Sequence, residues 1–143
     1  MKEYEDYLYE DSDDWLLQES TKSDAQALKS NIKILMLHLL KYEVEYWKQN
    51  NSWLRSINYS QNTIIEFASS RSVMNKVNTP DEMEKIYQQA VKEAVAETGL
   101  NRKEFPANIP NYFTIENFTN KQFIMNFLVQ KAYTDEIKRL LGL

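Results

Sequence analysis

Apolar side chains recur at helical spacing near the start of the chain. Between residues 23 and 51 they follow steps of four, three, four, three and four, which is the periodicity of one side of an α-helix. Ile34, Leu37 and Leu40 widen this stripe until most of the helix surface is apolar. A helix of that kind normally lies at the centre of a bundle, with neighbours on several sides. The residues of the stripe are Leu28, Ile32, Leu35, Leu39, Tyr42 and Tyr46.

Polar residues mark where this helix and the next one begin. Ser23 is followed three residues later by Gln26, which is the pattern of a capping box, so we expect the central helix to start there and to end near residues 49–51. We expect Ser52 to cap a second helix that runs to about Ser69. The short connection predicts that the two helices pack antiparallel. The residues that recur at helical spacing along the second helix are Trp53, Ile57, Ser60, Ile64 and Phe67.

A third helix has the strongest start signal in the sequence. Thr79 is a good cap, and Pro80 follows at the first helical position, where the missing N–H costs nothing. Gly99 ends this helix, because glycine adopts the left-handed conformation of a C-cap without steric strain. Residues 73–77, which precede the third helix, either extend the second helix or form a separate turn.

Two prolines interrupt the next segment. Pro106 and Pro110 are four residues apart, which prevents a helix across them and predicts an extended loop held by apolar side chains. Thr119 and Gln122 form another capping box pattern, so we expect a C-terminal helical extension over residues 119–143. One long helix and two short ones both fit this segment. We expect it to pack on its own bundle in preference to a second copy, because it holds too many apolar side chains for a solvated tail. They include Phe123, Ile124, Phe127, Leu128, Ile137, Leu140 and Leu141.

The whole pattern predicts a single all-α domain over residues 1–143. No stretch shows the alternation of a β-strand, and 2 Gly and 3 Pro are too few for an all-β fold with many tight turns. We expect an antiparallel bundle of four to five main helices, with the Pro-containing loop before the C-terminal helix.

Charge is distributed unevenly along the chain. Residues 1–19 hold eight acidic residues and one lysine, whereas the whole chain has a net charge of −4, so the remainder is basic. We therefore expect this acidic N-terminal segment to dock electrostatically on the more basic body or to bind a basic partner. Apolar anchoring by Tyr7 and Trp15 is the alternative.

Four short strings occur in an order that resembles one protein family. They are Leu35–Lys41, Trp53–Ile57, Tyr87–Ala90 with Ala94 leading to Glu97–Leu100, and Phe105-Pro106 with Pro110. Over about residues 15–113 this order and spacing resemble domain-of-unknown-function family twenty-nine, a group of small bacterial helical proteins. The segment after Phe113 is longer than the family's usual one. The resemblance implies an all-α fold and carries no activity with it.

The residue types exclude several kinds of chemistry. There is no Cys and only one His, which excludes zinc fingers, Fe–S clusters and thiol catalysis. The sequence has no glycine-rich phosphate loop and no serine elbow. We expect no metal and no cofactor. Catalysis could come only from carboxylate, Tyr or Lys side chains that tertiary structure brings together.

Four residues are candidates for an interaction or packing role: His38, Lys41, Trp53 and Arg55. His38 is the one side chain with an ordinary pKa near neutrality, but it lies among leucines. We therefore interpret it as a partly buried residue that forms a hydrogen bond to a neighbouring helix and fixes the packing. Trp and Arg are frequent in interface hot spots. A core tryptophan with a surface arginine is nevertheless the favoured interpretation of Trp53 and Arg55.

These observations favour a non-enzymatic helical interaction protein that binds a protein partner or a second copy of itself. Two alternatives stay open. One is a small enzyme with an inter-helix pocket near His38. The other is weak nucleic-acid binding through Lys22, Lys29, Lys33 and Lys41, which the net negative charge disfavours. No apolar run approaches the roughly 20 residues of a membrane span. The sequence also lacks a secretory signal pattern. We expect a cytoplasmic protein.

Overall fold

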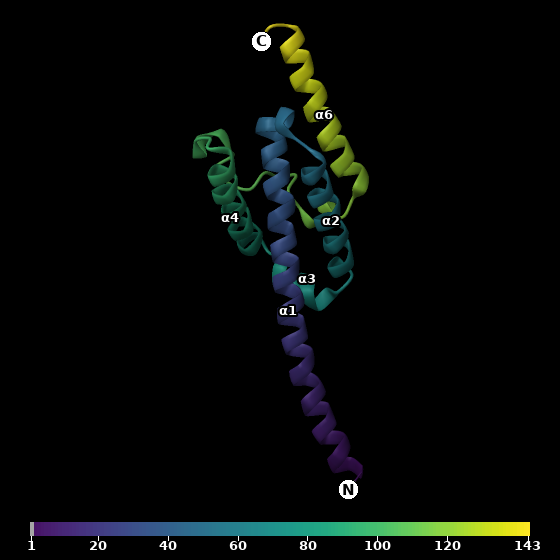
Figure 1. Cartoon of the computed structure of the whole chain (residues 1–143). Coiled ribbons are helices and arrows are strands. Elements are labelled where there is room, and N and C mark those ends of the chain that lie inside the picture. Colours follow the sequence, from purple (N-terminus) through teal and green to yellow (C-terminus); the bar gives the residue numbers. More distant parts are fainter. Residues whose placement is uncertain (1) are drawn as a thin grey trace.

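The computed structural model describes the backbone of residues 2–143 and the side chains of residues 20–143. Over the described backbone the chain forms helices and connecting turns and no strand, so the predicted all-α bundle is confirmed (Figure 1). The expected docking of the acidic residues 1–19 concerns side chains outside the described part. The elements are α1 (Lys2–Glu45), the 3₁₀ turn η1 (Tyr46–Lys48), α2 (Asn51–Ala68), α3 (Arg71–Val77), α4 (Pro80–Thr98), the 3₁₀ turn η2 (Arg102–Glu104), α5 (Ile115–Phe118) and α6 (Lys121–Leu140).

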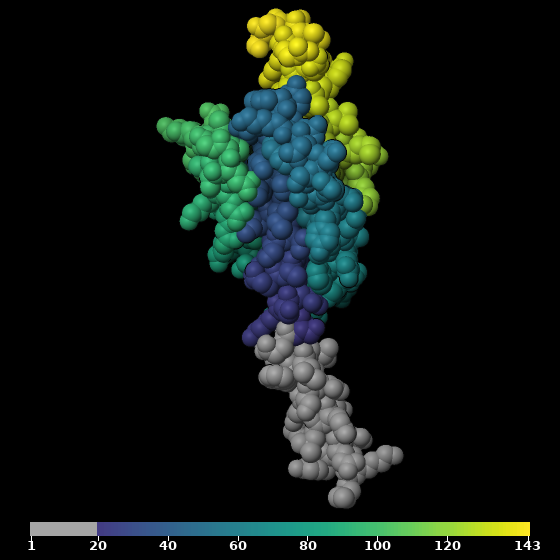
Figure 2. Space-filling view, in the orientation of Figure 1, coloured from purple at the N-terminus to yellow at the C-terminus, as the bar shows by residue number. Residues whose placement is uncertain are grey.

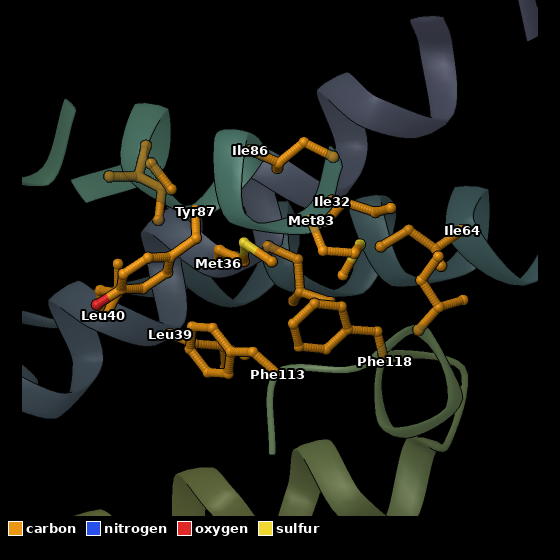
Figure 3. Packing of buried hydrophobic residues seen from close by; sticks show 14 of the residues in the cluster. Ile32, Met36, Leu39, Leu40, Ile64, Met83, Ile86, Tyr87, Phe113 and Phe118 are labelled. Carbon is orange, nitrogen blue, oxygen red and sulfur yellow. The ribbon is translucent and has the colours of Figure 1, made fainter. Parts of the chain in front are cut away.

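Helix α1 is the centre of the bundle, as its wide apolar stripe predicts. It contacts α2, α3, α4 and α6, and α2 runs antiparallel to it (Figure 1). The rings of Phe113 and Phe118, whose centroids are 5.4 Å apart, close the core from the loop and α5 (Figure 3). Each large side chain buried in this way contributes about 1.5–3 kcal/mol. The fully buried residues of α1 are Leu28, Ile32, Leu35, Met36 and Leu39.

The predicted start of the central helix at Ser23 is wrong. Residues 20–22 are already helical and α1 passes straight through Ser23, which is exposed together with Gln26. A serine with a glutamine three residues later is compatible with the interior of a helix when both side chains point to solvent. The predicted end of the helix near residues 49–51 is close to the observed one. The α-helix ends at Glu45 and continues as the 3₁₀ turn η1, which ends at Lys48.

The predicted cap of the second helix is also wrong, by two residues. Asn50 caps α2, and its Oδ1 accepts a hydrogen bond of 3.1 Å from the backbone N–H of Trp53. Asparagine and serine cap about equally well, so the pattern alone does not choose between Asn50 and Ser52. Residues 73–77 belong to a separate helix, α3, which Ser70 caps.

Both predicted ends of the third helix are confirmed. Thr79 Oγ1 accepts a hydrogen bond of 3.2 Å from the N–H of Glu82, and Pro80 is the first residue of α4. Gly99 has φ of 72° and donates its N–H to the carbonyl of Val95. A residue with a side chain would be strained at that φ.

The loop after α4 is held by polar contacts as well as by apolar side chains. Phe105, which we expected to hold the loop together with Ile109, is buried, whereas Ile109 is half-buried and Phe113 is buried instead. In addition, the guanidinium of Arg102 donates to the backbone carbonyls of residues 105–107. The hydroxyl of Tyr87 donates to the carbonyl of Pro106 at 2.7 Å. The bonds of Arg102 hold the loop together, and the bond of Tyr87 fastens it to α4.

The last helix is a single one and does not start at Thr119. Thr119 closes the short helix α5, and Asn120 caps α6 by accepting from the N–H groups of Gln122 and Phe123. Packing of this segment on its own chain is confirmed as far as residue 136, because half-buried side chains continue to that position. Ile124 is buried and Phe127 is half-buried, whereas Ile137 and the residues after it are exposed.

Candidate functional site

Three of the four predicted residues lie together where α1, α2 and α4 meet. Lys41 of α1 places its Nζ 4.3 Å from the centre of the Trp53 ring and 2.8 Å from Oε2 of Glu97 on α4. The His38 ring lies 6.4 Å from the Trp53 ring, at an angle of 52°. We call His38, Lys41, Trp53 and Glu97 the Trp53 cluster.

Burial and charge give the Trp53 cluster a packing role. Lys41 is only 9% exposed, and a buried ammonium needs a partner to offset its loss of water. Glu97 supplies the opposite charge, and the Trp53 ring supplies a cation–π contact, which is worth up to about 2 kcal/mol where water is excluded. The cluster therefore ties three helices together.

His38 is half-buried and its ring lies against Trp53 of α2, but in the described part of the chain its Nδ1 does not make the expected hydrogen bond to a neighbouring helix. Its Nδ1 is buried and has no hydrogen-bond partner among the described residues. Burial lowers the pKa of His38, and the nearby Lys41 lowers it further, while Glu97 acts in the opposite direction. The imidazole is therefore neutral at pH 7.

Arg55 lies apart from the Trp53 cluster. It is exposed on α2 and lines a shallow hollow with Asn51, Leu54 and Asn58. Because it is two residues from Trp53, the helix turns its side chain to another side. The sequence did not single out Glu97, since its ion pair with Lys41 spans 56 residues of chain.

The lysines that suggested nucleic-acid binding are mostly paired with acids on α4. Lys29 lies 3.0 Å from Glu82, and Lys33 lies 2.8 Å from Glu93. Lys41 pairs with Glu97 in the same way. Because a carboxylate neutralises each of these lysines, this side of α1 is not a free row of positive charge.

A different surface is exposed and apolar. Along α6 and its C-cap, five apolar side chains recur at every fourth position, and we call them the α6 outer face. Met125 is 60% exposed, Val129 62% and Tyr133 66%, and Leu141 is likewise open to solvent. The C-terminal turns of α6 extend beyond the other helices (Figure 2). The five residues are Met125, Val129, Tyr133, Ile137 and Leu141.

Single exposed apolar residues are ordinary, but a continuous row of them marks a contact surface. The four-residue ladder was visible in the sequence. It was missed because apolar residues at helical spacing are normally assigned to the core.

The described residues contain neither a membrane-spanning helix nor a metal-binding group. No helix in that part of the chain is long and apolar enough to cross a membrane. Within the same residues, no three or more His, Asp or Glu side chains gather in a group that could hold a metal ion.

Comparison with known proteins agrees with the family resemblance. No curated protein and no solved structure matches the chain. The family described as Domain of unknown function DUF29 matches residues 16–124, which is more than half of the chain. The matched region ends at Ile124, which is also the last buried residue. The chain therefore belongs to the DUF29 family.

Proposed function

We propose that this protein is a non-enzymatic helical interaction protein that self-associates through the α6 outer face. The observation that carries the proposal is the exposed row of apolar side chains with a constant four-residue spacing. Side chains four residues apart form a ridge on a helix, and two such ridges interdigitate when helices cross at about −50°. A second copy of α6 presents a matching ridge.

The spacing of the row favours a second copy over an unrelated partner. Tyr133 is at its centre, with Val129 and Ile137 four residues away on either side. Met125 and Leu141 follow at eight residues on either side. Two antiparallel copies related by a two-fold axis at Tyr133 would therefore place Val129 of each copy near Ile137 of the other, on either side of the crossing point.

The energy available is of the right order for a dissociable dimer. Two copies would bury ten apolar side chains, each worth about 1.5–3 kcal/mol if burial were complete. Because each of these side chains is already partly buried in the monomer, the free energy gained on association is smaller than this sum. Association costs about 4–15 kcal/mol in lost freedom. We therefore expect the dimer population to depend on protein concentration.

Cysteine cross-linking tests this register directly, because the chain contains no Cys of its own. A single Tyr133→Cys variant should form an intermolecular disulfide or bismaleimide cross-link. Lys138→Cys is the matched control, because Lys138 is also exposed but lies on another side of α6. A mixture of Val129→Cys and Ile137→Cys should cross-link between the two variants in preference to either alone.

Sedimentation of the unmodified chain at several concentrations completes the test. A dimer at high concentration that Val129→Glu abolishes supports the proposal. A chain that stays monomeric at every concentration overturns it, as does equal cross-linking at residues 133 and 138. A dimer that persists in Val129→Glu would show that another surface associates.

The two other functions have less support. The ion pairs of Lys29, Lys33 and Lys41 reduce the case for nucleic-acid binding. An enzyme pocket near His38 would need a nucleophile or a second acid–base group beside the imidazole. The described neighbours of His38 are instead engaged with one another in the Trp53 cluster.

A further inference from the structure

A cleft with a cavity volume of about 390 Å³ lies between α1, the Pro-containing loop and α6. Small-molecule sites in proteins have volumes of about 300–1,000 Å³, so this cleft has room for a small ligand. Its α6 residues include Phe123, Phe127 and Lys131, on a different side of the helix from the α6 outer face. The cleft therefore shares no residue with the proposed dimer surface.

Aromatic rings line the cleft. The centroids of Tyr112 and Phe127 are 6.1 Å apart, and those of Phe123 and Phe127 are 6.4 Å apart. Tyr112 is fixed from behind by an edge-to-face contact with the buried ring of Phe113, at 5.3 Å. Because the faces of aromatic rings carry partial negative charge, such a set attracts an organic cation.

The charged groups of the cleft also favour a cation. Glu43 of α1 is half-buried in the cleft, and no described residue forms a hydrogen bond or an ion pair with it. Lys131 has its own carboxylate partner, Asp135, at 3.9 Å. Asp135 does not line the cleft, but it pairs with Lys131 and so leaves Glu43 as the charge in the cleft without an ion-pair partner among the described residues. The pKa of the Glu43 carboxyl is raised, mainly by burial. The charge of Lys131 opposes this rise and that of Asp135 adds to it.

We infer that this cleft binds a small organic ammonium ion with an apolar body, which the aromatic rings hold while the Glu43 carboxylate pairs with its charge. An ammonium group gives Glu43 the partner that the protein does not provide, and a desolvated ion pair of this kind is stronger than an exposed one. The polar side chains Gln130 and Thr134 at the rim accommodate a polar substituent.

Calorimetric titration of the full chain with 2-phenylethylammonium chloride tests the inference. We expect saturable binding, and we expect Glu43→Gln to weaken it by about tenfold or more, the effect of losing one charge-assisted contact. Phe127→Leu should weaken it as well. The neutral 2-phenylethanol and the anionic 3-phenylpropionate are matched probes that should bind more weakly than the ammonium ion.

Two further variants keep the result interpretable. Glu43→Gln should fold normally, because it removes a half-buried charge without a partner, and a thermal melt checks this. Lys131→Gln should leave binding of the ammonium ion unchanged or strengthen it. The inference is overturned if the ammonium ion does not bind at millimolar concentration. It is also overturned if 3-phenylpropionate binds more tightly and Lys131→Gln abolishes that binding.

Discussion

The ammonium group of Lys41 lies 4.3 Å above the Trp53 ring, and this contact joins α1 to the first turn of α2. Lys41 is buried, whereas the Lys33–Glu93 pair further along α1 is partly open to water. The contribution of a charged contact depends strongly on such burial. Comparing the coupling free energies of the Lys41–Trp53 and Lys33–Glu93 contacts therefore shows the effect of excluding water.

We predict that a double-mutant cycle with Lys41→Met and Trp53→Leu gives a coupling free energy of about 1 kcal/mol in urea unfolding. The matched cycle with Lys33→Met and Glu93→Gln should give at most a few tenths of a kcal/mol, because both side chains are partly exposed. Equal coupling in the two cycles would contradict a special role for the Trp53 contact.

Acid should destabilise the fold through His38. Because its pKa is lowered in the folded state, the neutral imidazole stabilises the fold at pH above the ordinary value of 6.5, and this contribution is lost as the pH falls through the lowered pKa. We predict that His38→Gln flattens the loss of stability between about pH 6.5 and 5. Thermal melts of both proteins across that range measure it.

His38→Ala should lower the melting temperature at pH 7.5, where protonation plays no part. The half-buried imidazole packs against Trp53, so its removal leaves a gap between α1 and α2. A variant as stable as the original protein would show that His38 is not a packing residue.

Alkaline unfolding should depend on Tyr87. The hydroxyl of this buried side chain donates to the carbonyl of Pro106, and burial raises the pKa of Tyr87 to about 12. Since the folded-state pKa is above the ordinary value of 10, the stabilisation is complete below pH 10. It is lost as the pH rises towards 12, to the extent of about 2–3 kcal/mol.

Tyr87→Phe should remove this part of the alkaline loss and should cost about 1 kcal/mol at neutral pH for the missing hydrogen bond. Burial also raises the pKa of Tyr42 and of Tyr112, so these side chains contribute to the alkaline loss as well. The test is therefore the difference between the two unfolding profiles, and parallel profiles would rule out Tyr87 as a source.

Two isoleucines of α6 provide a matched pair. Ile124 is 4% exposed and Ile137 is 38% exposed. We predict that Ile124→Ala lowers the free energy of unfolding by about 2–4 kcal/mol, because it leaves a cavity in the core. Ile137→Ala should cost less than about 1 kcal/mol in the monomer and should weaken self-association. The reverse order would mean that the second half of α6 packs on the chain in solution.

The success of prediction from the sequence differed between elements for physical reasons. The central helix and the ends of α4 were predictable, because a wide apolar stripe, Thr79-Pro80 and Gly99 have few alternative interpretations. The start of α2 was missed because Ser52 caps as well as Asn50, and the start of α6 was missed because the capping-box pattern of Thr119 and Gln122 lies one residue before the pattern of Asn120.

The candidate site was predictable only where its residues are close in sequence. His38 and Lys41 are one turn apart on a helix, and Trp53 opens the next helix. Glu97 and Glu43 take their roles from tertiary packing, which places them beside Lys41 and the aromatic cleft, respectively. The spacing of residues along the chain does not report such contacts.

Ile124 is the last buried residue, so the interior is complete before most of α6 has been formed. Phe127 and Leu128 are the last apolar side chains that pack against it, so the residues after Leu128 can change in sequence, or be fused to another protein, without opening the core. If the proposed pairing holds, related chains in one cell could acquire different C-terminal rows and each assemble only with copies of itself. The shared bundle would then fold the same way in all of them, while the C-terminal segment specified the partner.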